Sequence, residues 1–146
     1  MNKKTEDEIE RLLDNLSEAL GIEYTMIIHY PRLVNILKDK ETRELASKLG
    51  TDSLRHVDIV AKTIKELGRE PNWSFEPFPD EIDFVRIFQE QLRSEELALK
   101  LHRQNAAIAP SLSLRETFRN VANDEENHIE IVRNILSRLT QHATSY

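Results

Sequence analysis

The sequence predicts an all-α fold, a four-helix bundle in which a long crossover joins two helical hairpins. Apolar residues recur at steps of three and four through four long segments, which is the spacing of one face of a helix. The chain has 146 residues, enough for one domain, and its three glycines and five prolines suit long helices. We expect one domain over residues 1–146, with helices over about 5–38, 40–68, 80–109 and 113–140.

The composition excludes several classes of protein. The formal net charge of −6 argues against nucleic acid as a partner. The chain has no cysteine, so disulfides, iron–sulfur clusters and thiolate zinc sites are excluded, in agreement with a reducing compartment. No apolar run approaches the ~18 residues of a membrane span, and the N-terminus lacks the apolar stretch of a signal peptide. We therefore expect a cytoplasmic protein with no membrane partner.

Local signals suggest where the first two helices begin and end. The first should begin at Thr5, because Thr5-x-x-Glu8 has the form of a capping box. Pro31 interrupts its pattern and predicts a kink near Tyr30, or alternatively a stop and a restart there. The second helix should end at Gly68, since glycine is common just after a helix C-terminus.

The connection between the second and third helices decides the order of the bundle. The segment from Arg69 to Pro79 holds three prolines and three aromatic residues, so we interpret it as extended chain. Eleven residues reach about 36 Å, close to the ~42 Å length of the second helix, which makes the second and third helices parallel. We expect Trp73, Phe75 and Phe78 to cover the flank of the bundle, with a partner-binding patch as the alternative.

Acidic and hydroxyl residues mark the start of the last two helices. The third should carry Asp80, Glu81 and Asp83 in its positively polarised first turn. The fourth should open on a capping box that starts at Ser113 and should end near Leu139, with a polar tail after it.

Five polar residues occupy positions of the apolar pattern where a leucine or valine is expected. On a helix they point into the core, and all fall near the middle of their helices, so they should meet in one layer of the bundle. A buried carboxylate needs a hydrogen bond, a cation or a metal ion, and carboxylates with imidazoles suit iron or manganese. The candidate metal ligands are Glu23, His56, Glu95, Glu125 and His128.

An internal repeat supports this interpretation. In a lone Glu-x-x-His, the histidine is more often a hydrogen-bonded core residue than a metal ligand. Here, however, residues 51–60 and 123–132 share aspartate, histidine, isoleucine and valine at an offset of seventy-two. Such a repeat suggests two related hairpins about a pseudo-twofold axis. The repeat breaks at Ser53, where the second copy has Glu125.

The same offset relates two further pairs of residues. It carries Glu23 onto Glu95 and Tyr30 onto His102. Tyr30 and His102 lie two helical turns beyond the glutamates and should face inward. We expect them either to influence the metal site without binding the metal or to form a hydrogen bond with each other, and we favour this second, structural role.

These features resemble the ferritin-like di-iron carboxylate proteins, in particular bacterioferritin and the helical domain of rubrerythrin. In that family the first and third helices each supply a glutamate, and the second and fourth each supply a Glu-x-x-His. The motif Asp-Glu-Glu-Asn-His-Ile at residues 124–129 is similar to that of bacterioferritin, and five of the six ligand positions are filled. The sixth, a glutamate that bridges the two metals, is Ser53 here.

The resemblance implies a di-metal site with iron as the cofactor, or manganese or zinc in its place. It implies that Glu23 and His56 hold the first ion, that Glu95 and His128 hold the second, and that Glu125 lies between them. Three carboxylates and two divalent ions then leave a formal charge of +1, so binding should be weaker than in the family.

The resemblance also assigns roles to Asp52 and Asp124. Each would hold the imidazole of the opposite hairpin by a hydrogen bond from outside the ligand shell, which orients a ligand and raises its basicity. Alternatively they are ordinary aspartates at the core edge, or Asp52 swings in as a replacement ligand. Leu54 stands where bacterioferritin has its haem-ligating methionine, so no haem is expected.

Three functional classes remain open. The first is a di-metal oxidoreductase of the ferroxidase or peroxidase type, and the second is a metal-binding protein without turnover. The third is a degenerate ferritin-like scaffold with one or no metal that acts as a structural or interaction protein. We expect metal binding, with no catalytic residue assigned, and a homodimer, because the crossover is apolar and the resemblance suggests one.

Overall fold

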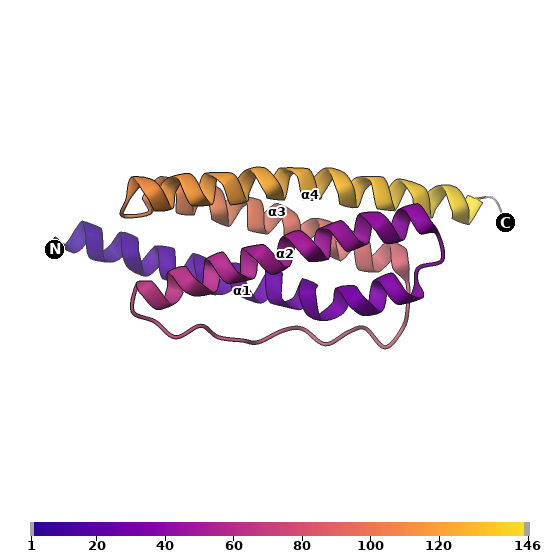
Figure 1. Cartoon of the computed structure of the whole chain (residues 1–146), viewed down its shortest axis with the longest axis horizontal. Helices are drawn as coiled ribbons and strands as arrows, with labels where there is room; N and C mark the ends of the chain where they lie inside the picture. Colours follow the sequence, from indigo (N-terminus) through magenta and orange to yellow (C-terminus); the bar gives the residue numbers. More distant parts are fainter. Residues whose placement is uncertain (1, 145–146) are drawn as a thin grey trace.

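The computed structural model describes residues 2–144 and folds them into four long helices (Figure 1). The helices are α1 (Lys3–Ile36), α2 (Lys40–Glu66), α3 (Phe84–Ile108) and α4 (Leu112–Thr144). α1 packs along α2 and α3 packs along α4, while α1 also contacts α3 and α2 contacts α4. The predicted all-α bundle of two hairpins is confirmed.

The connection from α2 to α3 returns along the length of the bundle, as Figure 1 shows in the thin segment beneath α1 and α2. α2 and α3 therefore run in the same direction, and α4 runs antiparallel to α3. The predicted crossover is confirmed, although it extends over residues 67–83 and is longer than the predicted segment.

α1 begins earlier than the sequence suggested. Its N-cap is Asn2, whose side-chain oxygen accepts a hydrogen bond from the backbone N–H of Thr5 at 2.8 Å. The predicted start at Thr5 is wrong, because asparagine caps a helix at least as well as threonine. α1 then continues through Pro31 to Ile36, so the alternative of a stop and a restart is also wrong.

α2 ends at Glu66 and is closed by Gly68, which has a positive φ of 94°. The N–H of Gly68 donates to the carbonyl of Lys65, and the N–H of Arg69 donates to that of Ile64. This pair of bonds is the Schellman arrangement, which needs a left-handed residue that glycine adopts without strain. The predicted role of Gly68 is confirmed.

α3 begins after the acidic segment and not within it. Asp83 is its N-cap and accepts from the backbone N–H of Arg86 at 3.2 Å. Asp80 and Glu81 therefore lie in the crossover, and the predicted start near residue 80 is wrong. The carboxylate of Asp83 satisfies an N–H in the first turn, which fixes Phe84 as the first helical residue.

α4 also differs from its predicted bounds. It begins at Leu112, because the hydroxyl of Ser111 accepts from the backbone N–H of Leu114 at 3.1 Å and takes the capping role predicted for Ser113. It runs on to Thr144, so the residues predicted to form a polar tail extend the helix up to the last described residue. Tyr146 lies outside the described residues.

The crossover lies against α1 through aromatic and backbone contacts. The rings of Trp73 and Phe75 meet the ring of Tyr24 edge-on, with centroids 5.3 and 5.8 Å apart. The backbone N–H of Glu76 donates to the hydroxyl of Thr25 at 3.0 Å. About half of the Trp73 and Phe75 side chains stays exposed, at 50% and 49%. The crossover thus covers the flank of α1 while leaving apolar surface open.

Two apolar clusters fill the bundle on either side of a central polar layer. One cluster includes Leu12, Leu16, Val60, Ile64 and Phe118. The other includes Leu33, Leu49, Phe88, Val132 and Ile135. Burial of these side chains stabilises the bundle, at about 25 cal/mol per Å² of apolar surface. None of the described helices combines the length and the apolar character that crossing a membrane requires.

Candidate metal centre

The polar layer at mid-bundle contains all five residues predicted as metal ligands. Each has at most 2% of its surface exposed. α1 contributes one glutamate, α2 one histidine, α3 one glutamate and α4 a Glu-x-x-His pair. These residues are Glu23, His56, Glu95, Glu125 and His128.

Glu125 lies between two imidazoles. Its Oε1 is 2.9 Å from Nδ1 of His56, and its Oε2 is 3.6 Å from Nδ1 of His128. The same nitrogen of His56 is 3.5 Å from Oε1 of Glu23, and that of His128 is 3.3 Å from Oε2 of Glu95. Each imidazole therefore shares Glu125 and has one glutamate of its own, which gives the layer two similar halves.

Two aspartates hold the imidazoles from outside. Nε2 of His56 is 2.9 Å from Oδ2 of Asp124, and Nε2 of His128 is 3.0 Å from Oδ2 of Asp52. Each contact joins α2 to α4 and so crosses between the hairpins. With Nε2–H donating to the aspartate, Nδ1 faces the centre of the layer, which is the orientation a metal ligand needs. Asp52 lies on the outer side of His128, so it does not enter the layer as a replacement ligand.

Several inward-facing atoms have no hydrogen-bond partner among the described residues. They include Oε1 of Glu23, Nδ1 of His56 and both carboxylate oxygens of Glu125. His56 Nδ1 and Glu125 Oε1 are close, but their angles do not make a hydrogen bond. A buried polar atom without a partner costs about 1–3 kcal/mol, and such atoms are rare in folded proteins.

These atoms form a donor set that fits a divalent ion. His56, Glu125 and His128 each offer a ligand atom, and the three atoms lie within 4.8 Å of one another. Carboxylate oxygens and imidazole nitrogens together bind iron, manganese or zinc. A cation placed among them would satisfy atoms that the protein itself leaves without partners.

Three solved structures that superpose on this chain are ferritin-like or related to bacterioferritin. A ferritin-like di-iron carboxylate protein of Bacillus anthracis superposes with a TM-score of 0.77 at 22% identity, over 93% of this chain and 99% of that chain. A dodecameric thioferritin of Bacteroides fragilis, related to bacterioferritin, gives 0.76 at 16% identity over 94% and 91%. The bacterioferritin of Desulfovibrio desulfuricans gives 0.74 at 23% identity over 97% and 85%.

The chain has a ferritin-like fold. At these identities the likeness shows the fold and no more. No protein-family model matches the sequence, and no curated protein matches it. What the ferritin-like chain does must therefore be argued from its own polar layer.

The carboxylates of the polar layer differ in how readily they take up a proton. Burial by itself raises the pKa of Glu23, but close contact with His56 and Glu125 lowers it to about 2, so Glu23 is ionised. Burial, together with the negative charge of Glu23, raises the pKa of Glu125 well above 4.5. Glu125 therefore takes up a proton much more readily than Glu23.

The two inward-facing imidazoles hold their protons strongly. Burial by itself lowers the pKa of His128, but Glu125 and Glu95 raise it to about 11. Burial has the same effect on His56, and Glu23 and Asp124 outweigh it to raise the pKa of that ring too. Without a metal ion, protons on the imidazoles offset the buried carboxylates. A metal ion would have to displace those protons, and its binding would release them to the solvent.

Ser53 occupies the position where this ferritin-like chain departs from its own second half. It lies on α2 one turn before His56, is fully buried, and its hydroxyl has no hydrogen-bond partner among the described residues. Serine is two carbon atoms shorter than glutamate, so its oxygen stays near its own helix. The position is buried, as that of Glu125 is, but it offers no carboxylate.

Tyr30 and His102, paired by the repeat, have different surroundings. The hydroxyl of Tyr30 is 3.4 Å from Oγ of Ser47, and Nδ1 of His102 is 3.4 Å from Nδ2 of Asn105. Nε2 of His102 has no partner among the described residues. The interpretation that Tyr30 and His102 satisfy each other is therefore wrong. The ring of Tyr30 packs on Gly50 instead, where a Cβ atom would come within 2.2 Å of it.

Gln91 is a contact residue that the sequence analysis missed. Its side-chain N–H donates to Oε1 of Glu95 at 2.7 Å from one turn earlier on α3. The signal in the sequence is its position four residues before Glu95, which puts the two side chains on the same face of α3.

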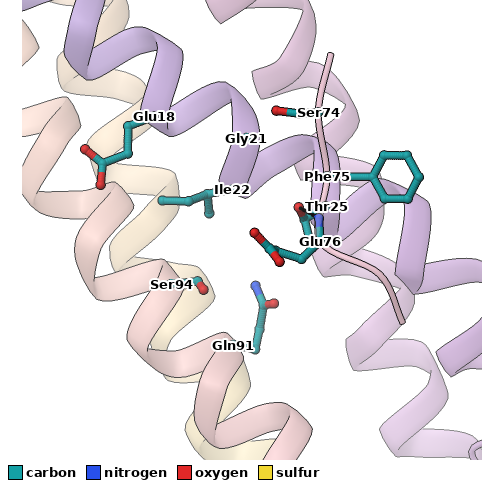
Figure 2. Close-up of a pocket in the computed structure, with 9 residues that line it drawn as sticks. All are labelled: Glu18, Gly21, Ile22, Thr25, Ser74, Phe75, Glu76, Gln91 and Ser94. Carbon is teal, nitrogen blue, oxygen red and sulfur yellow. Dashed lines mark hydrogen bonds between the residues drawn. The ribbon is translucent and has the colours of Figure 1, made fainter. Parts of the chain in front are cut away.

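Gln91 also connects the layer to the surface. It lines a pocket of about 290 Å³ between α1, α3 and the crossover, and Figure 2 shows its amide and the carboxylate of Glu76 pointing into this space. Glu18 and Thr25 line the same pocket from α1. The pocket brings solvent within one side chain of Glu95.

Proposed function

We propose that this ferritin-like protein binds divalent metal ions in its polar layer, with iron as the favoured ion and manganese or zinc as alternatives. The observation that carries the proposal is the set of buried ligand atoms without hydrogen-bond partners among the described residues, on Glu23, His56 and Glu125. A hydrogen-bonded core would pair these atoms with each other. Here they converge without pairing, as donors around an ion do.

The arrangement supports two ions that share one carboxylate. Glu23 and His56 would hold the first ion and Glu95 and His128 the second, and Glu125 would be shared between them. Three carboxylates leave two divalent ions with a formal charge of +1, so the protein should recruit water or an anion, or bind the second ion more weakly. The aspartates behind the imidazoles keep both rings oriented for binding.

We further propose an oxidoreductase activity of the ferroxidase or peroxidase type. If ferrous ions were bound by these residues, they could supply two electrons, one from each ion, and with two protons this would reduce one hydrogen peroxide to two water molecules. The apolar clusters above and below the layer keep bulk water out, and the pocket at Gln91 is large enough to admit a small oxidant.

A metal-free scaffold is the second candidate, and one observation favours it. The pKa of His128 rises to about 11, mainly because Glu125 and Glu95 outweigh the effect of burial, so a proton alone offsets part of the buried negative charge. In that case the layer is a structural network and the function lies on the surface.

Metal content separates the two candidates. The protein is purified without chelator, its iron, manganese and zinc are measured by mass spectrometry, and ferrous iron is titrated anaerobically. We expect one or two ions per chain. Glu125→Gln should lose most of this binding, whereas the adjacent Glu126→Gln, which changes an exposed carboxylate, should keep it. A wild-type protein that holds and takes up no metal would establish the scaffold.

Turnover requires a separate measurement. Ferrous protein is mixed with hydrogen peroxide or dioxygen, and the appearance of ferric iron is followed by absorbance. Oxidation faster than in buffer, and lost in Glu125→Gln, would support the oxidoreductase. Binding without accelerated oxidation would limit the protein to metal binding.

We also propose a homodimer. Apolar side chains remain exposed on the crossover and on α2, with Trp73 at 50%, Phe75 at 49% and Leu54 at 54%. A second copy that covered them would remove apolar surface from water. Sedimentation at micromolar concentration gives the mass, and a monomer would refute the proposal.

A further inference from the structure

His102 carries an unused nitrogen beside the ligands. It lies on α3 two turns after Glu95, is fully buried, and its Nε2 has no hydrogen-bond partner among the described residues. Glu23, His102 and Glu125 each offer a ligand atom, and these three atoms lie within 4.8 Å of one another. They form a second group next to that of His56, Glu125 and His128.

We propose that His102 is a direct metal ligand, which adds an imidazole to the ion held by Glu23 and His56. The inference rests on the proposed metal binding and deepens it. It gives the polar layer a donor from α3 in a chain that has Ser53 where the second copy of its repeat has Glu125. The donor number of one ion is thereby restored, although the added ligand is neutral and leaves the formal charge unchanged.

The surroundings of His102 hold the ring in one position. Its face stacks on Phe118, with centroids 5.8 Å apart and planes within 5°. Its Nδ1 is 3.4 Å from the side-chain amide of Asn105, and both residues are fully buried. A purely structural histidine at this place would have partners for both nitrogens. In this ring Nδ1 has a partner and Nε2 has none among the described residues, while one ring nitrogen lies within 4.8 Å of carboxylate oxygens of Glu23 and Glu125.

Asn105 also determines which nitrogen can bind. Its Oδ1 has no partner among the described residues, and the two ends of an amide exchange places by a half-turn. With Oδ1 turned to His102, the amide accepts the Nδ1–H, and the lone pair of Nε2 faces Glu23 and Glu125. At His56 and His128, an aspartate accepts from Nε2–H and Nδ1 faces the layer. At His102, an amide oxygen takes the place of the carboxylate, and Nδ1 and Nε2 exchange these roles.

The charge of the ring agrees with this role. Burial, only partly offset by the negative charge of Glu23, lowers the pKa of His102 to about 4, so the ring is neutral at neutral pH. His102 can therefore bind an ion without first losing a proton, in contrast to His56 and His128.

One consequence is that the two ions are not equivalent. The first would have His102 with Glu23 and a share of Glu125, and a second imidazole from His56, whose Nδ1 is 3.5 Å from Oε1 of Glu23. The second would have one imidazole. The repeat relates Tyr30 to His102, but the hydroxyl of Tyr30 lies near Ser47. The second half of the layer therefore gains no ligand equivalent to His102. Binding should occur in two steps, with the histidine-rich position filled first.

The test uses His102→Phe, which keeps a ring on Phe118 and removes both nitrogens. Tyr30→Phe is the matched control, because it removes a polar atom at the repeat-related position. Anaerobic titration with Mn²⁺ gives the affinity of the first ion, and pulsed electron paramagnetic resonance at one equivalent counts the histidine nitrogens bound to it. We expect two such nitrogens in the wild type and in Tyr30→Phe. In His102→Phe we expect one, with affinity reduced by at least about tenfold.

The outcomes test the proposed metal binding and the proposed role of His102 separately. If the wild type binds no Mn²⁺ or iron, the proposed function fails. If the wild type binds and His102→Phe binds equally well with two nitrogens, the inference fails and the proposed function stands. Circular dichroism and melting of the metal-free proteins check the fold. If His102→Phe does not fold, His102→Gln, which is smaller and keeps a polar end, is measured against the same expectation of one bound histidine nitrogen.

Discussion

Asp52 on α2 accepts a hydrogen bond from Nε2 of His128 on α4, over a distance of 3.0 Å. Asp124 on α4 makes the reciprocal contact with His56 on α2 at 2.9 Å. Each hairpin therefore orients a candidate ligand of the other. If the layer binds metal, both hairpins must be docked before either imidazole is in position.

Replacing these aspartates should weaken metal binding. We expect Asp52→Asn and Asp124→Asn each to lower the affinity by about 10- to 100-fold, because a neutral amide supports the imidazole less well. Isothermal titration with Mn²⁺ measures the change. Asp58→Asn, which changes an exposed carboxylate on α2, is the control and should bind as the wild type does. Unchanged affinity in both variants would mean that the aspartates serve only the fold.

Ser53→Glu should strengthen a site that already binds metal. The added carboxylate supplies a ligand and takes the formal charge of a two-metal layer from +1 to neutral. We expect the variant to hold two ferrous or manganous ions per chain more tightly and to oxidise iron faster. In a metal-free scaffold, another buried carboxylate would cost a few kcal/mol of stability.

Melting of both proteins, with and without iron, decides the matter. Ser53→Gln is the control, since it has the size of glutamate without the charge. A Ser53→Glu protein that melts lower and gains nothing from metal would show that the layer is a scaffold.

The stability of the metal-free protein should fall as the pH rises. The pKa of His128 is raised from 6.5 to about 11 in the folded state. The proton on this ring therefore stabilises the fold fully below about pH 6.5 and ceases to do so as the pH approaches 11. The raised pKa of Glu125 acts in the same direction.

Thermal melting between about pH 6 and 10 tests this dependence. Chelator-treated wild type should lose melting temperature with rising pH, and His128→Gln should lose less. Metal-loaded protein should lose less as well, since an ion replaces the protons. Equal slopes for wild type and His128→Gln would contradict the expectation.

Gly50→Ala should destabilise the first hairpin. A Cβ atom at this position would lie 2.2 Å from the ring of Tyr30, so the ring or the helix must shift. Overpacking of this kind costs about 1–3 kcal/mol, partly offset by the better helix propensity of alanine, about 1 kcal/mol. Urea unfolding gives the free energy. The loss should largely disappear in a Tyr30→Ala background, and a loss that persists there would have another cause.

Sequence pattern alone predicted the helices and the layer because both depend on local periodicity. A residue three or four positions from a leucine shares its face, whatever the rest of the chain does. For that reason Glu23 and Glu95 could be placed in the core, and the repeat gave the Glu-x-x-His motif its weight. The helix ends were less accurate, because Asn2, Asp83 and Ser111 competed with other residues that also cap helices.

Local periodicity and segment length were enough to predict the bundle, its crossover and the five polar residues that face inward. The contacts of those residues depend on tertiary packing. The contacts from Asp52 to His128 and from Gln91 to Glu95, and the open nitrogen of His102, depend on rotamers and helix packing that no periodicity encodes. The protonation of the layer was decided there too, because the pKa of His128 depends on Glu95, which lies on a different helix.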